Sequence, residues 1–435
     1  MEHPPRTVVV VGAGLAGLTA AATAADAGAG AGADVTLLDA REHVGGRART
    51  ADVDGFLLNQ GAHALYRGGP AWATLTELGV SPRGNTPNAA GAMGWRADGT
   101  LAPLPAGASS LVRSDLVGWR AKVDLARLLA RPARLVASVE PGTSMQQWID
   151  SRSRDTDTRA LLGLFSRVST YCGDLDALDA HAGVTQLVQA LTHGVVYLDG
   201  GWQQLVDGMQ HVARALGVRV HTRAKVDAID ARGEGFVIRT ADGDFDADAV
   251  VHAAGGPADL DAALHGANAT VASWVQRERP VVASTLDLAL RALPVPDRRI
   301  TFGLDEPVYF SVHTPYARLV PDGPGEVAHL LWYGDADDDP RPRLEALLDR
   351  AQPGWRDEVV EARYGRRLVV AHGRPLPGSG FAGRPSVAVP DAPNLFVAGD
   401  WVGPEGLLAD AVFASGRAAG RAAAAAIVDT RQVTA

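Results

Sequence analysis

Cysteine, lysine and long apolar runs are scarce in this sequence. Cys172 is the only cysteine among 435 residues, which excludes an intrachain disulfide, a cysteine-based zinc site and a dithiol redox pair. No stretch of ~18 apolar residues predicts a transmembrane helix, and no signal peptide precedes the first apolar run, so the cytoplasm is the expected compartment. Lys122 and Lys225 are the only lysines, and arginine therefore carries nearly all of the positive charge.

Charge and motif patterns exclude several further classes of function. The formal net charge of −9 disfavours a nonspecific nucleic-acid binder. No HxH, HExxH or paired-carboxylate pattern indicates a metal or glycosidase site, and the acidic run 335–339 lacks the glycine and the distal glutamate of a calcium loop. The composition is that of a folded enzyme, since 46% of the residues are apolar and 21% are charged. The length suggests two or three domains.

A glycine motif near the N-terminus predicts a phosphate-binding turn. Residues 8–11 form an apolar β-branched run typical of a strand buried on both faces, and residues 15–27 have the alanine and leucine content of a packed helix. At this junction, Gly12 permits a sharp turn, Gly14 lets the backbone approach a pyrophosphate, and Gly17 lets the helix lie close to the strand. The phosphates would then lie at the positive end of the helix.

An acidic residue completes the dinucleotide pattern. A second apolar run, residues 35–38, ends at Asp39, whose carboxylate can accept hydrogen bonds from ribose hydroxyls. A free 2′-hydroxyl suits FAD or NAD, whereas the 2′-phosphate of NADP would be repelled. The order of strand, glycine turn, helix, strand and acid therefore predicts a site for one of these two dinucleotides.

The segment that follows resembles a flavoprotein fingerprint. Residues 39–47, DAREHVGGR, resemble the second FAD fingerprint of the flavin monoamine oxidase, protoporphyrinogen oxidase and phytoene desaturase superfamily. In that superfamily the acid holds the adenosine ribose, and the arginine and backbone of GGR reach the FAD phosphates and the ribityl chain. The resemblance implies these roles for Asp39, Gly46 and Arg47. A plain NAD dehydrogenase has no need of the GGR segment.

Later blocks resemble the same superfamily in the same order. Residues 217–230 resemble the return of the chain to the FAD domain, where the residue matching Val226 contacts adenine through its backbone. Residues 394–400 resemble a strand ending in an acid, here Asp400, that binds the ribityl and pyrophosphate region. The helix after it directs backbone N–H groups at the flavin ring. The residues expected to bind FAD are Gly12, Gly14, Ala16, Gly17, Asp39, Arg41, Gly46, Arg47, Gly61, Ala62, Val226, Gly399, Asp400, Leu407 and Leu408.

These blocks imply an α/β fold in which a Rossmann-type, GR2-like FAD-binding domain is joined to a substrate domain. The FAD-binding domain is expected to be discontinuous, with residues 1–75, 198–258 and 385–435. Residues 76–197 and 259–384 are expected to form the substrate domain, the first insert as a helical cap and the second as a mixed sheet. Helical periodicity covers 119–136, 145–151, 158–171 and 184–192, and strand-like runs cover 281–290, 308–313 and 327–333.

Candidate catalytic residues come from matched positions, because FAD supplies the hydride acceptor and requires little acid or base from the protein. Residues 59–63, NQGAH, resemble the stretch whose backbone runs beside the flavin ring, which places His63 near that ring. This histidine is expected to take a substrate proton, to bind a carboxylate, or to be a structural residue bonded to backbone. Trp401 is expected either to wall the pocket or to belong to the core. Elements expected to face the cavity also carry Tyr171, His313, Tyr316 and Tyr333.

Two departures separate the chain from the amine oxidase branch. Leu407 or Leu408 stands where that branch has a flavin-facing tyrosine, and the second insert contains no lysine to hold a water at flavin N5. The chain looks closer to the phytoene desaturase-like and protoporphyrinogen oxidase-like members. We predict a FAD-dependent oxidoreductase that dehydrogenates an apolar or amphipathic small molecule by hydride transfer to N5, with O₂ or another acceptor reoxidising the flavin. An amine or amino-acid oxidase and a flavin-dependent isomerase without net redox are the alternatives.

Two points concern covalent attachment and the membrane. We expect noncovalent FAD, because neither Cys172 nor any histidine lies in the superfamily's C-terminal attachment context. The segment 119–136 is basic and amphipathic, so it could touch a membrane surface and collect a lipophilic substrate. The interpretation that we favour is a cover helix with a solvated outer face. No metal and no nucleic-acid partner are expected.

Overall fold

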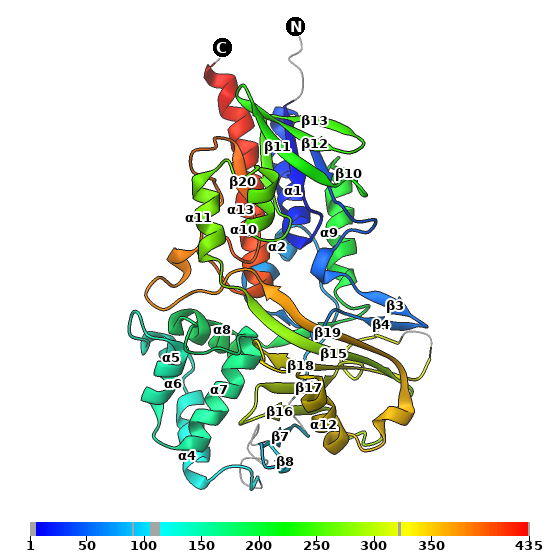
Figure 1. Ribbon diagram of the computed structural model, residues 1–435, viewed down its shortest axis with the longest axis vertical. Coiled ribbons are helices and arrows are strands. Elements are labelled where there is room, and N and C mark those ends of the chain that lie inside the picture. Colours follow the sequence, from blue (N-terminus) through cyan, green and yellow to red (C-terminus); the bar gives the residue numbers. More distant parts are fainter. Residues whose placement is uncertain (1–5, 89–90, 105–113, 321–322, 434–435) are drawn as a thin grey trace.

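The computed structural model describes residues 6–88, 91–104, 114–320 and 323–433 (Figure 1). A parallel five-stranded sheet with the order β10-β2-β1-β14-β20 organises one end of the molecule. Its strands are β1 (Thr7–Val11), β2 (Asp34–Leu38), β10 (Arg219–His221), β14 (Ala249–His252) and β20 (Leu395–Val397). Val8 on the central strand pairs with Val35 on one side and Ala249 on the other. Three segments far apart in the sequence therefore build one sheet.

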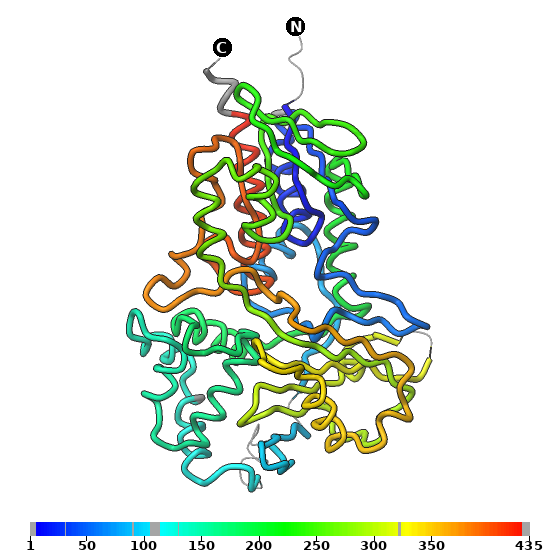
Figure 2. The backbone as a smooth tube through the Cα atoms, viewed as in Figure 1, coloured from blue at the N-terminus to red at the C-terminus, as the bar shows by residue number. Residues whose placement is uncertain are grey.

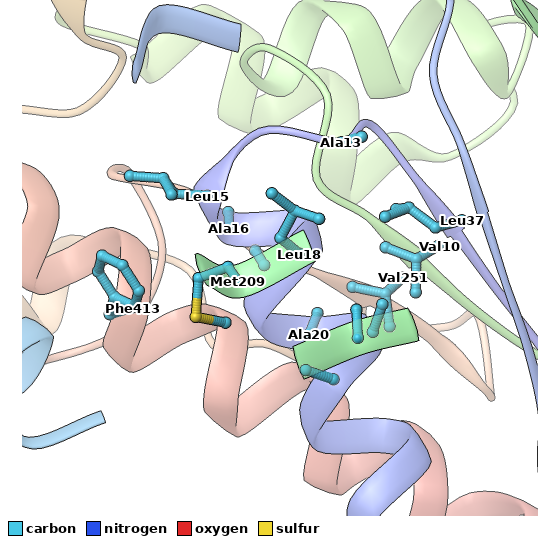
Figure 3. Packing of buried hydrophobic residues seen from close by; sticks show 14 of the residues in the cluster. Val10, Ala13, Leu15, Ala16, Leu18, Ala20, Leu37, Met209, Val251 and Phe413 are labelled. Carbon is cyan, nitrogen blue, oxygen red and sulfur yellow. The ribbon is translucent and has the colours of Figure 1, made fainter. Parts of the chain in front are cut away.

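Helices cover one face of this sheet. They are α1 (Leu15–Gly28), α2 (Pro70–Glu77), α9 (Gln203–Ala215) and α13 (Leu408–Val433). Figure 3 shows their core, in which Leu18, Met209 and Phe413 belong to one apolar cluster with Val10 and Val251. Successive side chains of a strand point to opposite faces of the sheet. Val8 and Val10 therefore pack in this core, while Val9 and Val11 pack in a second core on the opposite face.

The opposite face carries a small antiparallel sheet and two helices. These elements are β11 (Val226–Arg232), β12 (Gly235–Thr240), β13 (Gly243–Ala247), α10 (Pro257–Ala263) and α11 (Ala269–Arg277). Leu260, Val271 and Trp274 share a buried cluster with Val9 and Val11. The segment 259–277, which the sequence suggested for the substrate domain, thus packs on the parallel-sheet side, because its apolar side chains cover that face.

A mixed seven-stranded sheet lies at the other end of the molecule, with the order β19-β15-β18-β17-β16-β7-β8 (Figure 1). Its strands are β7 (Met93–Trp95), β8 (Leu101–Pro103), β15 (Val281–Leu290), β16 (Ile300–Gly303), β17 (Val308–Val312), β18 (Glu326–Tyr333) and β19 (Val359–Ala371). All pairs are antiparallel except β16 with β7. Every residue of β15 is buried, because α12 (Arg341–Ala351) covers one face and the helical layer the other.

The helical layer comprises α4 (Trp119–Leu129), α5 (Ala133–Ala137), α6 (Met145–Arg152), α7 (Thr156–Thr170) and α8 (Ala180–His193). Side-chain caps fix where three of these helices begin: Ser144 forms a capping box with Gln147, and Asp155 and Asp179 accept backbone N–H bonds. The expected helix over 119–136 is interrupted at Pro132, which has no N–H to donate.

Short strands connect the two ends of the molecule. They are β3 (Ala51–Val53), β4 (Phe56–Leu58), β5 (Leu65–Tyr66), β6 (Gly84–Asn85) and β9 (Val195–Leu198). Figure 2 shows that both termini lie at the parallel-sheet end and that the chain passes repeatedly between the two ends. The predicted fold class, a Rossmann-type sheet joined to a mixed sheet with helices, is confirmed. Within the described ranges, no helix combines the length and the apolar character needed to cross a membrane.

Candidate functional site

The glycine turn has a different steric environment at each of its three glycines. Gly12 has φ +97°, and its N–H donates to the Leu38 carbonyl at 2.7 Å. A Cβ on Gly17 would lie 1.8 Å from the Gly12 carbonyl oxygen, whereas a Cβ on Gly14 would meet no heavy atom of the described residues within 4 Å, the local backbone aside. Gly12 is therefore required for the turn and Gly17 for close packing, while Gly14 borders open space at the start of α1.

The N-terminus of α1 is suited to an anion. Gly14 occupies the N-cap position, where no side chain caps the helix, and the first turn contains no acidic residue. Uncapped N–H groups at a helix start need hydrogen-bond acceptors, and the helix dipole favours negative charge there. A pyrophosphate meets both requirements, so this turn fits the phosphate part of FAD.

Asp39 is held in place at the carboxyl end of β2. Its Oδ2 accepts the Ala13 N–H and its Oδ1 accepts the Arg41 N–H, both at 2.7 Å. The Ala224 N–H donates to the Asp39 carbonyl at 2.8 Å, which brings the start of β11, with Val226, beside the acid. The carboxylate expected at the ribose and the backbone expected at the adenine are thus neighbours.

Arg47 and Asp400 lie together although 353 residues separate them in the sequence. The Arg47 Nη2 is 2.5 Å from Asp400 Oδ2, and Asp400 Oδ1 accepts the His372 N–H at 2.7 Å. Asp400 is 2% exposed and Arg47 is 44% exposed. The two side chains expected at the phosphates and the ribityl chain therefore share one location, and the arginine keeps access to solvent.

A second arginine, which the sequence did not single out, lies near this pair. Burial lowers the pKa of Arg384 to about 10, and the charge of Asp400 opposes that effect. Its guanidinium donates to the Gly406 carbonyl at 2.8 Å, and its Nε is buried without a hydrogen-bond partner among the described residues. Two guanidinium groups around one carboxylate leave a net positive charge, which favours an anionic ligand.

The C-terminal block is built around the start of α13. The Ser415 hydroxyl bonds both the N–H and the carbonyl of Gly399, at 3.0 and 2.9 Å. Leu408 has φ +53° at the first position of the helix, and Leu407 and Leu408 border a small hollow beside Cys172. Ala16 is buried in α1, against α13.

Residues 61–63 connect the parallel-sheet end to the mixed sheet. Gly61 has φ +85°, and its N–H donates to Asp287 Oδ2 on β15 at 2.9 Å. The Gly61 carbonyl is 2.9 Å from His63 Nδ1, and the Tyr171 hydroxyl donates to the Ala62 carbonyl at 2.8 Å. Since a carbonyl can only accept, His63 Nδ1 carries the proton and Nε2 is an acceptor.

A pocket of about 240 Å³ lies beside His63, between the mixed sheet and helices α7 and α8. Five tyrosines give it an aromatic lining: Tyr66, Tyr171, Tyr197, Tyr309 and Tyr333. His63 and His313 supply its two imidazoles. Among the described residues that line it, none is an acid, a lysine or an arginine. Of the residues expected to face the cavity, Tyr171, His313 and Tyr333 line it, whereas Tyr316 packs edge-on against Tyr197.

The pocket is electrically neutral at physiological pH. Burial lowers the pKa of His63 and of His313, and it raises the pKa of Tyr171 and Tyr333 well above the ordinary value. The imidazoles are therefore uncharged and the phenols protonated. The pocket offers aromatic surface and hydrogen bonds but no charge to pair with an ionic substrate.

A buried histidine–carboxylate hydrogen bond that the sequence did not reveal lies behind the pocket. His329 Nδ1 is 2.7 Å from Asp287 Oδ1, and the two side chains are 0% and 6% exposed. His329 also contacts the ring of His313, with centroids 4.5 Å apart. The signal in the sequence was a single carboxylate in the otherwise apolar and hydroxylic run 281–290, because isolated acids are rare in fully buried strands.

Trp401 lies outside the tyrosine-lined pocket. It is 5% exposed, belongs to the cluster under the parallel sheet and packs on Trp274 with ring centroids 5.8 Å apart. It does not line the pocket, so the position next to Asp400 contributes to the core. In the described part of the chain, no group of three histidine, cysteine or acidic residues is arranged to hold a metal ion.

Comparisons with known proteins agree with this geometry. The family described as flavin containing amine oxidoreductase matches residues 15–424. Coproporphyrinogen III oxidase of Mycobacterium bovis is 30% identical over 275 residues, covering 57% of this chain and 59% of that protein. Carotenoid 3,4-desaturase of Haloarcula japonica is 27% identical over 278 residues, covering 54% and 53%. The matches thus span little more than half the length of these curated relatives.

Solved structures show the same fold over nearly the whole chain. Cyclohexylamine oxidase from Brevibacterium oxydans superposes with a TM-score of 0.71 at 17% identity, covering 99% of this chain and 100% of that one. An oxidoreductase from Methanosarcina mazei superposes with a TM-score of 0.72 at 21% identity, covering 94% and 98%. At these identities the superpositions establish the fold alone.

Proposed function

Because the chain belongs to the flavin-containing amine oxidoreductase family and is therefore a FAD-dependent oxidoreductase, we propose that it dehydrogenates a small, uncharged, amphipathic molecule bound in the tyrosine-lined pocket. The observation that carries this proposal is the neutral aromatic pocket, which adjoins His63 and the Gly61 loop. Bound FAD supplies the acceptor for the hydride that leaves a substrate carbon. O₂ or another acceptor takes the electrons afterwards.

The proposed cofactor site uses the residues described above. The turn from Gly12 to Gly17 and the start of α1 hold the pyrophosphate, Asp39 holds the adenosine ribose, and the backbone near Val226 contacts adenine. Arg47 and Asp400 bind the phosphate and ribityl region. The backbone around the flavin comes from Gly46, Gly61, Ala62, Gly399, Leu407 and Leu408. We propose that FAD is bound noncovalently.

His63 is the proposed base. Its Nδ1–H is bonded to the Gly61 carbonyl, so Nε2 presents a lone pair. The imidazole lines the pocket and packs edge-on against Trp202, with ring centroids 4.9 Å apart. When a C–H bond of the substrate is broken as a hydride, a proton leaves the adjacent N–H, O–H or C–H group, and His63 Nε2 accepts it.

The size and charge of the pocket limit the substrate class. A pocket of about 240 Å³ is at the small end for a bound organic molecule. A polycarboxylate such as coproporphyrinogen III would find no cation among the described lining residues, and burying an unpaired charge is costly. A long polyene would exceed the volume. The proposed substrate is therefore a compact ring compound with one hydrogen-bonding group.

Amine oxidation is a second candidate, supported by the aromatic lining. Tyr171 and Tyr309 each pack against Tyr333, with ring centroids 5.9 and 6.4 Å apart. Tyrosine faces attract the ammonium form of an amine through their electron-rich rings. Tyr171 follows the last residue of α7, and the other two tyrosines lie on β17 and β18. They provide aromatic walls although Leu407 and Leu408 stand in the C-terminal motif.

Anaerobic flavin bleaching tests the proposal. The holoenzyme is mixed with small cyclic amines such as cyclohexylamine and with partly saturated rings that lack nitrogen, and loss of the flavin absorbance is followed. Bleaching by the rings without nitrogen supports the first candidate, and bleaching by amines alone supports the second. His63→Gln is expected to slow bleaching by about 10²-fold or more, while the exposed control His181→Gln reacts like wild type. An unchanged rate in His63→Gln would remove His63 as the base.

A further inference from the structure

We infer that Asp287 and His329 form a buried positioning pair that holds His63 in the tautomer needed to accept a substrate proton. The inference rests on the proposed role of His63. Asp287 and His329 do not line the pocket, so neither touches a substrate. They act on His63 through the hydrogen bonds that Gly61 makes.

The first step is the attachment of the loop to the mixed sheet. Asp287 Oδ2 accepts a hydrogen bond from the Gly61 N–H at 2.9 Å, and Asp287 Oδ1 accepts a hydrogen bond from His329 Nδ1–H at 2.7 Å. Each carboxylate oxygen of Asp287 thereby has a hydrogen-bond donor. The Asp287 side chain is only 6% exposed. A buried carboxylate needs such donors to be stable. The hydrogen bonds from Gly61 and His329 therefore hold Asp287 in place, and Asp287 in turn holds both donors.

The second step is the orientation of the Gly61 carbonyl. Gly61 has φ +85°, and a Cβ at this position would lie 2.9 Å from Thr285 Cγ2 on β15. The residue is therefore pressed against the strand that carries Asp287. With its N–H held by Asp287, its carbonyl points at His63 Nδ1. This contact selects the tautomer with the proton on Nδ1 and the lone pair on Nε2.

The charges around His63 act in both directions. Burial has the largest effect and lowers the pKa of His63, and His329 and Arg47 lower it further. Asp287 is the only carboxylate among the groups that influence His63 and raises its pKa, so it favours the protonated imidazole that a base becomes after taking a proton. The pair therefore acts on His63 through hydrogen bonds rather than through its net charge.

The tautomer can be measured without a substrate. In holoenzyme labelled with ¹⁵N-histidine, long-range ¹H–¹⁵N correlation distinguishes the protonated from the unprotonated ring nitrogen, and His63→Gln assigns the signal. The wild type is expected to show Nδ1 protonated. Asp287→Asn is expected to lower the ratio of the Nδ1–H to the Nε2–H tautomer about fivefold, the equivalent of one hydrogen bond of about 1 kcal/mol. His329→Leu should do the same.

Two controls separate positioning from general structural damage. His329→Asn retains an N–H donor for Asp287 and is expected to restore the wild-type ratio, and the exposed Asp335→Asn should leave it unchanged. An unchanged His63 tautomer in both Asp287→Asn and His329→Leu overturns the inference, as does failure of His329→Asn to rescue. If instead the tautomer shifts while His63→Gln bleaches flavin at the normal rate, the positioning pair stands and the proposed base does not.

Discussion

At the scale of single residues, the dinucleotide site is defined by what each backbone position tolerates. Gly12, Gly14 and Gly17 are close in sequence, yet their surroundings differ. Gly12 lies in a left-handed turn, Gly14 borders open space, and an added Cβ on Gly17 would approach a carbonyl oxygen to 1.8 Å. The sequence predicts these three roles because they depend on a local strand-turn-helix path, and the steric surroundings of the glycines agree with it. The role of Asp39 at the ribose stays a prediction.

Exchanging two of these glycines for alanine should separate folding from cofactor binding. Gly14→Ala adds a methyl group where, beyond the local backbone, no described residue has an atom within 4 Å. The apoprotein should therefore keep its stability while FAD affinity falls about tenfold or more, or about 1.4 kcal/mol. Gly17→Ala should instead destabilise the apoprotein by about 1–3 kcal/mol. Apoprotein denaturation and FAD titration measure both effects. Equal loss of stability in the two variants would refute this account of the turn.

His252, on the buried strand β14, predicts a pH dependence of stability. Burial lowers its pKa from 6.5 to about 4, so between these values the unfolded chain binds a proton that the folded chain does not. The stabilisation is complete above the unfolded pKa and is lost as the pH falls toward the folded pKa. Between about pH 7 and about pH 5 this residue should account for about 2 kcal/mol of the loss in unfolding free energy.

Urea denaturation of the wild type and of His252→Asn at these two pH values measures that contribution. The variant is expected to be less stable at neutral pH but to lose about 2 kcal/mol less on acidification. An identical pH dependence in both proteins would show that His252 is not the group responsible.

At the scale of elements, the pairing of α1 with α13 holds the first and last parts of the chain together. A Cβ on Gly416 would lie 2.7 Å from the Ala16 carbonyl oxygen, and one on Gly420 would lie 2.4 Å from that of Ala20. The small residues of the C-terminal segment thus allow the helices to touch through their backbones. The resemblance predicted a helix after Asp400, but the helix against which it packs was not predictable, because nearly 400 residues intervene.

Gly420→Ala is expected to force the two helices apart. The added carbon clashes with backbone, which cannot rotate away, so the free energy of unfolding should fall by about 1–3 kcal/mol. Ala425→Ser adds one atom to an exposed position of the same helix and should change it by less than about 0.5 kcal/mol. Chemical denaturation compares the three proteins, and equal stability of Gly420→Ala and Ala425→Ser would argue against close backbone packing.

Elements also show where prediction from sequence ends. The runs at 281–290 and 327–333 coincide with β15 and nearly with β18, because a short, mainly apolar run is typical of a buried strand. The contact between Asp287 on β15 and His329 on β18 depends on antiparallel register, in which these two residues are direct partners. Trp401 shows the reverse case: its proximity to Asp400 in sequence suggested the pocket, but Trp274 covers it in the core.

At the scale of the whole molecule, residues from both ends of the chain meet in one site. Arg47 and Asp400 are joined across the parallel-sheet end, and Gly61 is joined to Asp287 on the mixed sheet. Each of these two hydrogen bonds includes a buried carboxylate, Asp400 or Asp287. Because a site built from such distant segments exists only in the folded chain, FAD binding should stabilise the molecule, by about 2.7 kcal/mol at a hundredfold excess over Kd.

The central claim is that this flavoenzyme acts on small uncharged molecules because its pocket carries no charge. The most direct test mixes the anaerobic holoenzyme with coproporphyrinogen III and, separately, with compact neutral ring compounds, and records the flavin absorbance. The account predicts bleaching by members of the neutral set and none by the polycarboxylate. Rapid bleaching by coproporphyrinogen III, with none by the neutral compounds, would contradict it.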